Sequence, residues 1–275
     1  MTGTAVVTGA SSGIGAATAR ALGEAGFDVV VGYGGNREAA ETIAREIARD
    51  AKVRTWAVGF PLADPAASVA ALRGAVEAAG GIDVLVNNAG INRRASALEE
   101  DLDSWSHVLT VDLHSPFALA QEAARTMVAQ GRGGRIVNVT SVHEHIPIAG
   151  GSAYCAAKSA LGMVTKTMAL ELGEHGIAVV SVAPGETATP MNGHDEAVDP
   201  ATVARPVVPA GRPGDPREVA DLIRWLVSGR SGYVTGQSFV VDGGLSLIAA
   251  DANVRSVLGE DAVGYRGRVA AGTGS

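Results

Sequence analysis

A tyrosine and a lysine four residues apart, Tyr154 and Lys158, are the residues of this chain whose types and spacing could do chemistry. If residues 152–174 form a helix, the two side chains lie on one face, about 5–6 Å apart at their Cβ atoms. A free tyrosine loses its proton only at about pH 10, but a fixed positive charge beside it stabilises the phenolate. Tyr154 could then act as a general acid and base toward the oxygen of a carbonyl or an alcohol.

Ser141, thirteen residues before Tyr154, could hold that oxygen. It follows an apolar run over residues 135–139 that predicts a buried strand, so its hydroxyl would lie at the carboxyl end of the strand, where α/β proteins bind ligands. The alternative is a helix whose tyrosine covers the core and whose lysine extends to solvent. The Tyr-x-x-x-Lys spacing alone favours this alternative.

The rest of the chain predicts the elements that position these residues. Short runs rich in valine, isoleucine and alanine alternate with longer segments of helical period. This alternation predicts a parallel sheet with helices on both faces, right-handed crossovers and ligands at the carboxyl ends of the strands. Strands are expected at residues 5–7, 28–31, 53–58, 84–86, 135–139, 178–182 and 239–241, and helices near 14–25, 37–49, 66–79, 104–130, 152–174 and 215–228.

Composition limits the class of protein. The chain has 275 residues, of which 47% are hydrophobic and 19% charged, so it can bury one large core. Its formal net charge of −7 argues against a nucleic-acid partner or an anionic membrane surface. No basic leader and no apolar stretch of about eighteen residues is visible, so we expect a soluble, cytoplasmic protein with no membrane segment.

We expect one catalytic domain over residues 1–250 and a tail over 251–275, which is either frayed or contacts a neighbouring subunit. Within the domain, residues 190–216 carry six prolines, including one at each end, and predict irregular structure. A segment of this kind after the sixth strand suits a substrate lid, and a solvated loop is the alternative.

A glycine-rich turn, Thr8-Gly9-Ala10-Ser11-Ser12-Gly13-Ile14-Gly15, joins the first strand to the first helix. Glycines allow the backbone to approach a pyrophosphate closely, and the amides at a helix start stabilise its oxygens. The strand–turn–helix context favours this reading over a plain turn.

Several motifs now occur together and in order: Thr-Gly-x-x-x-Gly-x-Gly at 8–15, Asn-Asn-Ala-Gly at 87–90, Ser141, the pair Tyr154 and Lys158, and Pro184-Gly185 followed by Thr189. Over roughly residues 3–248 the chain resembles the short-chain dehydrogenases/reductases, in a branch near bacterial glucose dehydrogenases and 3-oxoacyl-acyl-carrier-protein reductases. The resemblance implies a single Rossmann-type domain with a doubly wound, seven-stranded parallel sheet. It also implies a homotetramer and a nicotinamide cofactor across the strand ends.

The resemblance also implies roles for single residues. Lys158 would hold the nicotinamide ribose as well as act on Tyr154, which also contacts the cofactor. The pyrophosphate and adenosine side would be lined by Gly9, Ser11, Ser12, Gly13, Ile14 and Gly15; the riboses by Asn87, Ala89 and Gly90; and the nicotinamide ring by Pro184, Gly185, Thr187 and Thr189.

Two positions depart from the family pattern. Asp112 stands where the family commonly has an asparagine that links the catalytic lysine to solvent through water. An aspartate can accept the same water-mediated bond, so we expect a working relay and count Asp112 among the catalytic residues. Pro61 stands where an aspartate usually meets the adenine amino group, so adenine contacts would depend on the Leu62 backbone and on apolar packing.

A third departure bears on the choice of cofactor. An NAD enzyme usually ends its second strand with an acid that accepts the ribose hydroxyls. Here that strand ends at Tyr33, and Asn36 and Arg37 follow as possible donors to a 2′-phosphate. We therefore expect NADP(H) in preference to NAD(H), which remains possible. A solvated residue at a helix start is the alternative for Arg37.

Substrate residues are expected after Ser141 and near the cofactor. His143, Glu144 and His145 should line the pocket mouth or cap its loop, Glu186 adds a carboxylate near the cofactor, and Met191 is a further substrate residue. A metal site is not expected, because no separate cluster of histidine or cysteine accompanies the His-Glu-His run. The polar lining favours a small, polar or hydroxylated ketone or alcohol. Further polar lining, or else ordinary surface, is offered by Arg93, Arg94 and His114.

The sequence thus favours an NADP(H)-dependent oxidoreductase that interconverts a ketone or aldehyde with an alcohol by hydride transfer, with Tyr154 as general acid and base. A 3-oxoacyl-thioester reductase is one alternative, although it would need a basic patch for an acidic carrier protein. A nicotinamide-binding sensor or scaffold without turnover is the other, but mere binding has no need of a lysine beside the tyrosine.

Overall fold

A computed structural model describes residues 3–195 and 198–248 of the chain. Its centre is one sheet of seven parallel strands in the order β3-β2-β1-β4-β5-β6-β7. The predicted doubly wound, Rossmann-type fold is therefore confirmed. The strands are β1 (Thr4–Val7), β2 (Asp28–Tyr33), β3 (Thr55–Gly59), β4 (Val84–Asn87), β5 (Gly134–Val139), β6 (Ile177–Pro184) and β7 (Ser238–Val241).

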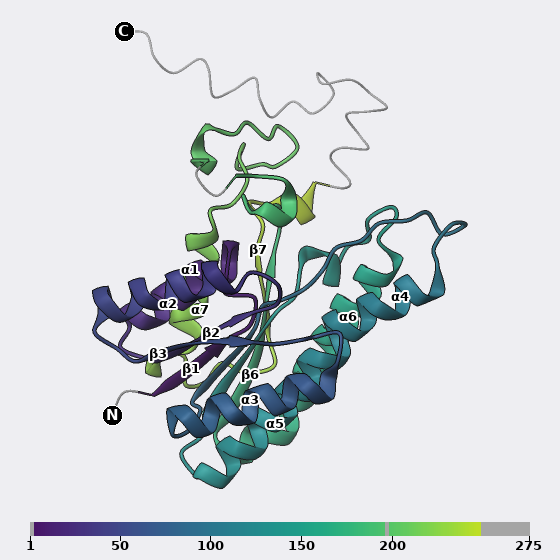
Figure 1. Cartoon of the computed structure of the whole chain (residues 1–275). Helices are drawn as coiled ribbons and strands as arrows, with labels where there is room; N and C mark the ends of the chain where they lie inside the picture. Colours follow the sequence, from purple (N-terminus) through teal and green to yellow (C-terminus); the bar gives the residue numbers. More distant parts are fainter. Residues whose placement is uncertain (1–2, 196–197, 249–275) are drawn as a thin grey trace, which may run out of the picture.

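Helices cover both faces of the sheet (Figure 1). On one face α1 packs against α2 and α7, and on the other α3 packs against α5, with α6 beside it. The helices are α1 (Gly13–Glu24), α2 (Arg37–Ala51), α3 (Pro65–Ala79), α4 (Leu102–Leu109), α5 (Ser115–Gln130), α6 (Ser152–Leu172) and α7 (Pro216–Leu226).

Alternate strand residues serve the two cores. In β1, Ala5 and Val7 face the core under α1 and α2, whereas Val6 faces the core under α3 and α5. This is the period of two that a strand requires, and both faces are apolar because a parallel sheet is covered on both sides. The strand order reverses between β1 and β4, which is where such sheets bind ligands.

The helix predicted at 104–130 contains a break in its hydrogen-bond pattern. A π-helical turn, Thr110–His114, lies between α4 and α5. Pro116 follows it and has no N–H with which to continue the α-helical ladder. The turn carries Asp112 and directs it to the interior, where its side chain has no exposed surface.

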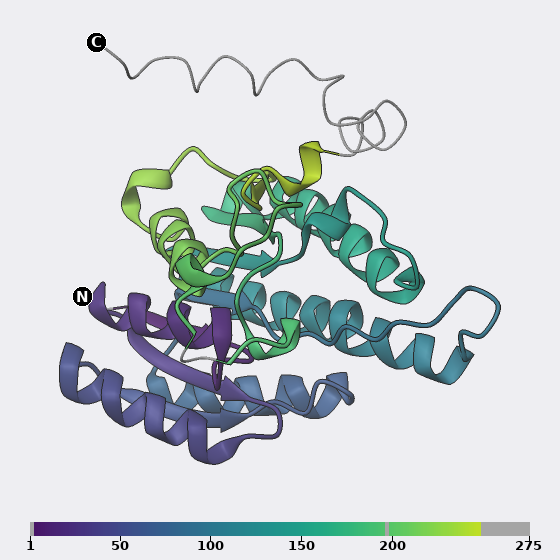
Figure 2. The ribbon, with the colours of Figure 1, turned by 90° about the horizontal axis from the view of Figure 1, so that it is seen from above.

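The proline-rich segment after β6 lies over the carboxyl ends of the strands, as the view from above shows (Figure 2). Its two ends are joined by a parallel bridge between Thr187 and Gly214. Short 3₁₀ turns, Pro190–Asn192 and Pro200–Thr202, are its regular structure among the described residues. The expected tail over 251–275 lies outside the described residues.

Candidate active site

A cavity of about 920 Å³ opens at the carboxyl ends of the central strands, and the glycine turn between β1 and α1 forms one wall. Gly9 has a φ of +63°, and a Cβ atom at Gly15 would lie 2.2 Å from the Gly9 carbonyl oxygen. Ser12 precedes α1 without capping it by its side chain. A closely approaching backbone at an uncapped helix start fits a pyrophosphate. The predicted turn residues all line the cavity: Gly9, Ser11, Ser12, Gly13, Ile14 and Gly15.

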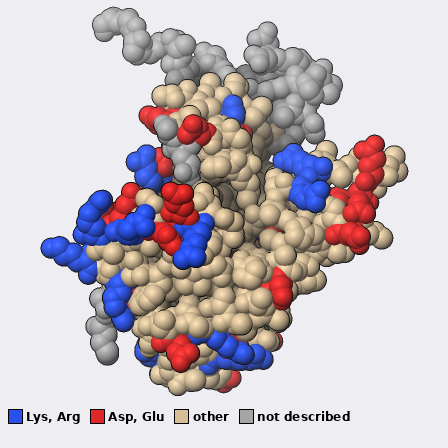
Figure 3. Space-filling view, viewed as in Figure 1, with Lys and Arg blue, Asp and Glu red and all other residues tan. Residues whose placement is uncertain are grey.

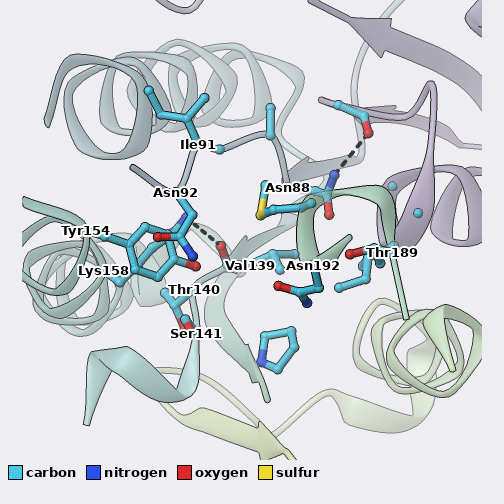
Figure 4. Close-up of a pocket in the computed structure, with 18 of the residues that line it drawn as sticks. Asn88, Ile91, Asn92, Val139, Thr140, Ser141, Tyr154, Lys158, Thr189 and Asn192 are labelled. Carbon is cyan, nitrogen blue, oxygen red and sulfur yellow. Dashed lines mark hydrogen bonds between the residues drawn. The ribbon is translucent and has the colours of Figure 1, made fainter. Parts of the chain in front are cut away.

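Ser141, Tyr154 and Lys158 line the same cavity (Figure 4). Tyr154 and Lys158 come from one face of α6, and Nζ of Lys158 lies 5.5 Å from the centre of the Tyr154 ring. Ser141 stands just beyond β5, and its hydroxyl oxygen accepts the His143 amide at 3.2 Å. The three side chains thus bring a hydroxyl, a phenol and a cation together at the strand ends.

Lys158 forms a buried ion pair with Asp112, with 3.2 Å between Nζ and Oδ2. The other oxygen of Asp112 accepts the Ile91 amide at 2.8 Å, and Nζ also donates to the Val139 carbonyl at 3.4 Å. The buried carboxylate of Asp112 thus contacts the ammonium directly, where the sequence predicted a bond through water. The relay from Lys158 to solvent stays a prediction. Burial lowers the pKa of Lys158, but the charges of Asp112 and Tyr154 raise it by more than burial lowers it. The pKa therefore lies above its ordinary value.

The end of the cavity where the resemblance puts the nicotinamide combines two loops. A Cβ atom at Gly90 would lie 3.0 Å from Oδ2 of Asp112 and 3.2 Å from Nζ of Lys158, so a side chain there would press on the ion pair. From the other side, the Asn192 amide donates to the Thr187 carbonyl at 2.8 Å and fixes the loop after β6. The cavity is lined here by Ala89, Gly90, Pro184, Gly185, Thr187 and Thr189, all of them predicted.

Asn87, by contrast, does not line the cavity. Its side chain is buried at the carboxyl end of β4, where it donates to the Pro116 carbonyl and to the Asn138 side chain, both at 3.0 Å. Its neighbour Asn88 lines the cavity instead and donates to the carbonyls of Thr8 and Gly9. Successive strand residues point to opposite faces, and this alternation was the available signal.

At the end of the cavity where the adenosine is expected, the structure brings together only some of the predicted residues. Tyr33 and Leu62 line the cavity, but Asn36 and Arg37 do not. The Asn36 side chain caps α2 by accepting the Ala39 amide, and Arg37 is exposed and paired with Glu41 at 2.6 Å. The Leu62 amide donates to the Phe60 carbonyl and its carbonyl accepts the Ser115 hydroxyl. Of the expected backbone contacts and apolar packing, apolar packing is therefore what Leu62 offers to the cavity.

The decisive comparison is with known families. The model of the short chain dehydrogenase family matches residues 3–199. The chain belongs to this family. Its members use NAD or NADP as cofactor.

Relatives of this short-chain dehydrogenase share nearly its whole length. An uncharacterized oxidoreductase, YohF of Escherichia coli, is 46% identical over 243 residues, which cover 88% of this chain and 95% of that protein. The crystal structure of acetoin dehydrogenase YohF from Salmonella typhimurium is 44% identical with a TM-score of 0.85, covering 90% of this chain and 97% of that one.

The expected branch is confirmed. A 3-oxoacyl-acyl-carrier-protein reductase of Vibrio cholerae is 37% identical over 89% of this chain and 97% of that protein. Glucose 1-dehydrogenase 2 of Bacillus subtilis is 34% identical over 89% and 95%. This short-chain dehydrogenase is therefore an oxidoreductase.

At the expected substrate end, three of the five predicted residues line the cavity: His143, Glu186 and Met191. Burial lowers the pKa of His143, and the nearby charge of Arg94 lowers it further, although a hydrogen bond with the Ile146 carbonyl opposes both. Glu186 is held by Arg205 at 2.5 Å, from the segment after β6.

His145 and Glu144 are the exceptions. His145 turns away from the cavity, and its Nε2 lies 3.0 Å from the Ser238 hydroxyl at β7. The Glu144 side chain is buried and does not line the cavity, so its expected place at the pocket mouth is wrong. Of the residues left open, Arg94 lines the cavity, whereas Arg93 and His114 do not. Cavity residues that the sequence did not single out include Asn92, His107, Ile146 and Ile148. These four lie on loops or a helix end with no periodic signal. Among the described residues, no group of three or more histidine, cysteine or acidic side chains could hold a metal ion.

Proposed function

We propose that this chain is an NADP(H)-dependent oxidoreductase that interconverts a small polar ketone with a secondary alcohol, using Tyr154 as general acid and base. The observation that carries the proposal is the cation of Lys158, held 5.5 Å from the Tyr154 ring in the cavity that the glycine turn also lines. A buried cation at that place can stabilise the negative charge that develops on the phenol oxygen as its proton is transferred.

Each of these residues has a separate role in the proposed reaction. In reduction Tyr154 donates its phenolic proton to the carbonyl oxygen, and Ser141 donates a hydrogen bond to the same oxygen. Lys158 stabilises the phenolate left behind and contacts the nicotinamide ribose. Asp112 keeps Lys158 charged, as the short distance between them supports. When bound, the nicotinamide supplies the hydride in reduction and accepts it in oxidation.

The lining supports a polar substrate of modest size. Arg94, His143 and Glu186 bring polar groups to the substrate end, beside the apolar side chains of Ile146 and Ile148. Two similar structures are acetoin dehydrogenases, from Salmonella typhimurium and Enterobacter cloacae. We therefore propose a vicinal hydroxyketone or diketone of a few carbon atoms as the substrate class.

The NADP(H) preference rests on the end of β2. Tyr33 lines the cavity where an acid would otherwise repel a 2′-phosphate. Arg37 is exposed nearby and within electrostatic reach of Tyr33. For the Arg37 guanidinium to contact the 2′-phosphate, its ion pair with Glu41 would have to break or to leave some of its N–H groups free.

A 3-oxoacyl-thioester reductase is the second candidate, supported by the relatives of that name. It would need a basic surface for an acidic carrier. Arg93 lines a second surface depression, which shares His107 with the cavity, but acidic side chains line this depression as well: Glu99, Glu100, Asp101 and Asp103. Basic and acidic groups also stand side by side on the face shown in Figure 3. This mixture favours a free small molecule over a carrier-bound one.

The proposed assembly is a homotetramer. Apolar side chains are exposed on the helices of the α5 and α6 layer, such as Phe117, Met163 and Leu170, and would be covered by neighbouring subunits. Among the described residues no helix is long and apolar enough to cross a membrane. We place the enzyme in the cytoplasm, since its one cysteine gives no internal disulfide.

The test is the absorbance change of the cofactor at 340 nm with a panel of acetoin, diacetyl, 2-butanone, an acetoacetyl thioester and a long-chain ketone. We expect turnover with the vicinal compounds and a higher kcat/KM with NADPH than with NADH. Turnover confined to the thioester would favour the second candidate. Tight cofactor binding without turnover of any compound would point to a sensor or scaffold.

A further inference from the structure

A buried carboxylate next to the catalytic serine has no part in the chemistry described so far. The Glu144 side chain is only 4% exposed. Its Oε2 accepts hydrogen bonds from three hydroxyls, those of Thr140 at 2.6 Å, Ser238 at 3.1 Å and Ser181 at 3.4 Å. A buried carboxylate costs free energy unless its oxygens are satisfied, and hydrogen bonds to a charged acceptor are the stronger kind. Glu144 therefore ties β6 and β7 to the residue that follows β5.

Glu144 also belongs to the turn that presents Ser141. The 3₁₀ turn Val142–Glu144 begins at Ser141, whose carbonyl accepts the Glu144 amide at 2.8 Å. Serine followed three residues later by glutamate is the spacing of a capping box. Here the carboxylate bonds instead to the hydroxyl of Thr140, the residue before the serine. Ser141 is thus held from both sides by the same glutamate, through the backbone after it and the side chain before it.

The same side chain touches the helix that carries the other catalytic groups. A Cβ atom at Gly162 would lie 2.2 Å from Oε1 of Glu144, so α6 can approach the turn only because residue 162 is glycine. The Ser159 hydroxyl adds a bond to the Glu144 carbonyl at 3.0 Å. Tyr154, Lys158 and Gly162 are spaced by four residues and share one helix face. Glu144 therefore separates the Ser141 turn from the stripe of α6 that bears the phenol and the ammonium.

We propose that Glu144 is a positioning residue that sets the place of the Ser141 hydroxyl relative to the Tyr154 phenol. It touches neither cofactor nor substrate, since it does not line the cavity. It acts by fixing the turn before α6 in one geometry. A shift of about 1 Å in a hydrogen-bond donor of this kind can cost as much as a hundredfold in rate. This inference rests on the proposed function, because it assigns Ser141 and Tyr154 to the same reacting oxygen.

The test is a double-mutant cycle on turnover between Glu144→Ala and Ser141→Ala. Glu144→Ala is expected to lower kcat at least tenfold while the dissociation constant for NADPH, read by fluorescence, changes less than twofold. In the Ser141→Ala background the same change should cost less than twofold, because the hydroxyl that it positions is gone. An equal loss in both backgrounds would overturn the proposal. Glu144→Gln can still accept hydrogen bonds from the hydroxyls, so it should keep most of the wild-type activity. It replaces the alanine variant in the test if that variant does not fold.

Gly162→Ala should reproduce the loss of kcat, since the added methyl group displaces the carboxylate. The matched control is Gly74→Ala on α3, where a Cβ atom meets nothing within 4 Å and activity should not change.

A second readout does not depend on turnover. Crystal structures of the wild type and of Glu144→Ala should differ by about 1 Å or more at the Ser141 turn. A turn that does not move overturns the positioning role, whatever the substrate. A turn that moves in an enzyme that turns over no compound contradicts only the proposed function.

Discussion

Removal of Asp112 tests the ion pair on which the proposed chemistry depends. Asp112→Ala leaves the Lys158 ammonium, whose side chain is 4% exposed, without its carboxylate at 3.2 Å. At an effective dielectric constant of about 20, two unit charges at that distance attract by about 5 kcal/mol. The Ile91 amide also loses its acceptor. Since breaking a buried pair from one side typically costs about 3–5 kcal/mol, we expect a loss of that size in the free energy of unfolding at pH 7.

The loss should depend on pH with a definite sign. In the wild type the pKa of Lys158 lies above its ordinary 10.5, so its stabilising charge is present at pH 7 and is lost only as pH rises through the folded-state value. In the variant, burial still lowers that pKa, and only the charge of Tyr154 is left to oppose it, so the pKa falls. The folded state then binds fewer protons than the unfolded chain, so the variant should recover up to about 1.4 kcal/mol per pH unit between pH 7 and pH 9.

The assay is urea unfolding at pH 7 and pH 9 at one protein concentration, for Asp112→Ala, Lys158→Met and the double variant. The double variant should lose less than the sum of the two single variants, because it leaves no buried charge unpaired. The matched control, Glu41→Ala, breaks an exposed pair and should change little. A loss below about 1 kcal/mol at both pH values, or strictly additive losses, would refute the buried pair.

Three further outcomes are expected. Tyr33→Asp should lower kcat/KM for NADPH at least tenfold and raise that for NADH, as initial rates at 340 nm will show; unchanged rates would contradict the role of this strand end. Asn87→Ala should cost about 1–3 kcal/mol in urea unfolding and leave NADPH affinity within twofold, because its amide serves Pro116 and Asn138; a large loss of NADPH affinity without a loss of stability would show that Asn87 contacts the cofactor after all. Since burial lowers the pKa of His143 below 6.5, the unfolded chain takes up its proton first, so stability should fall as pH drops below that value, and His143→Gln should reduce the fall in melting temperature between pH 7 and pH 5.5; an unaltered fall would exclude that titration.

The strands and helices were predictable because each carries its own period. In β1, for example, Ala5, Val6 and Val7 are apolar on both faces, as a covered parallel strand requires. The π-helical turn at Thr110–His114 was not predictable, because it depends on tertiary contacts. Its key contact joins Asp112 to the Ile91 amide, twenty-one residues away.

Local spacing placed Tyr154 and Lys158 correctly, since four residues on one helix fix their relation. It could not place Asn87, whose motif names two asparagines of which only the second lines the cavity. Nor could it place His145, which a 3₁₀ turn directs to β7 and not to the pocket mouth. Side-chain direction at the end of an element depends on the neighbouring strand, and a single sequence does not contain that information.

The most direct test of the proposed chemistry is Tyr154→Phe, measured by NADPH consumption at 340 nm with diacetyl and by NADPH fluorescence in the same preparations. Loss of a general acid costs about 10²–10⁴-fold in rate, so kcat should fall by at least a hundredfold while the dissociation constant for NADPH stays within about threefold. Turnover within tenfold of the wild type would contradict the assignment of Tyr154 as the proton donor.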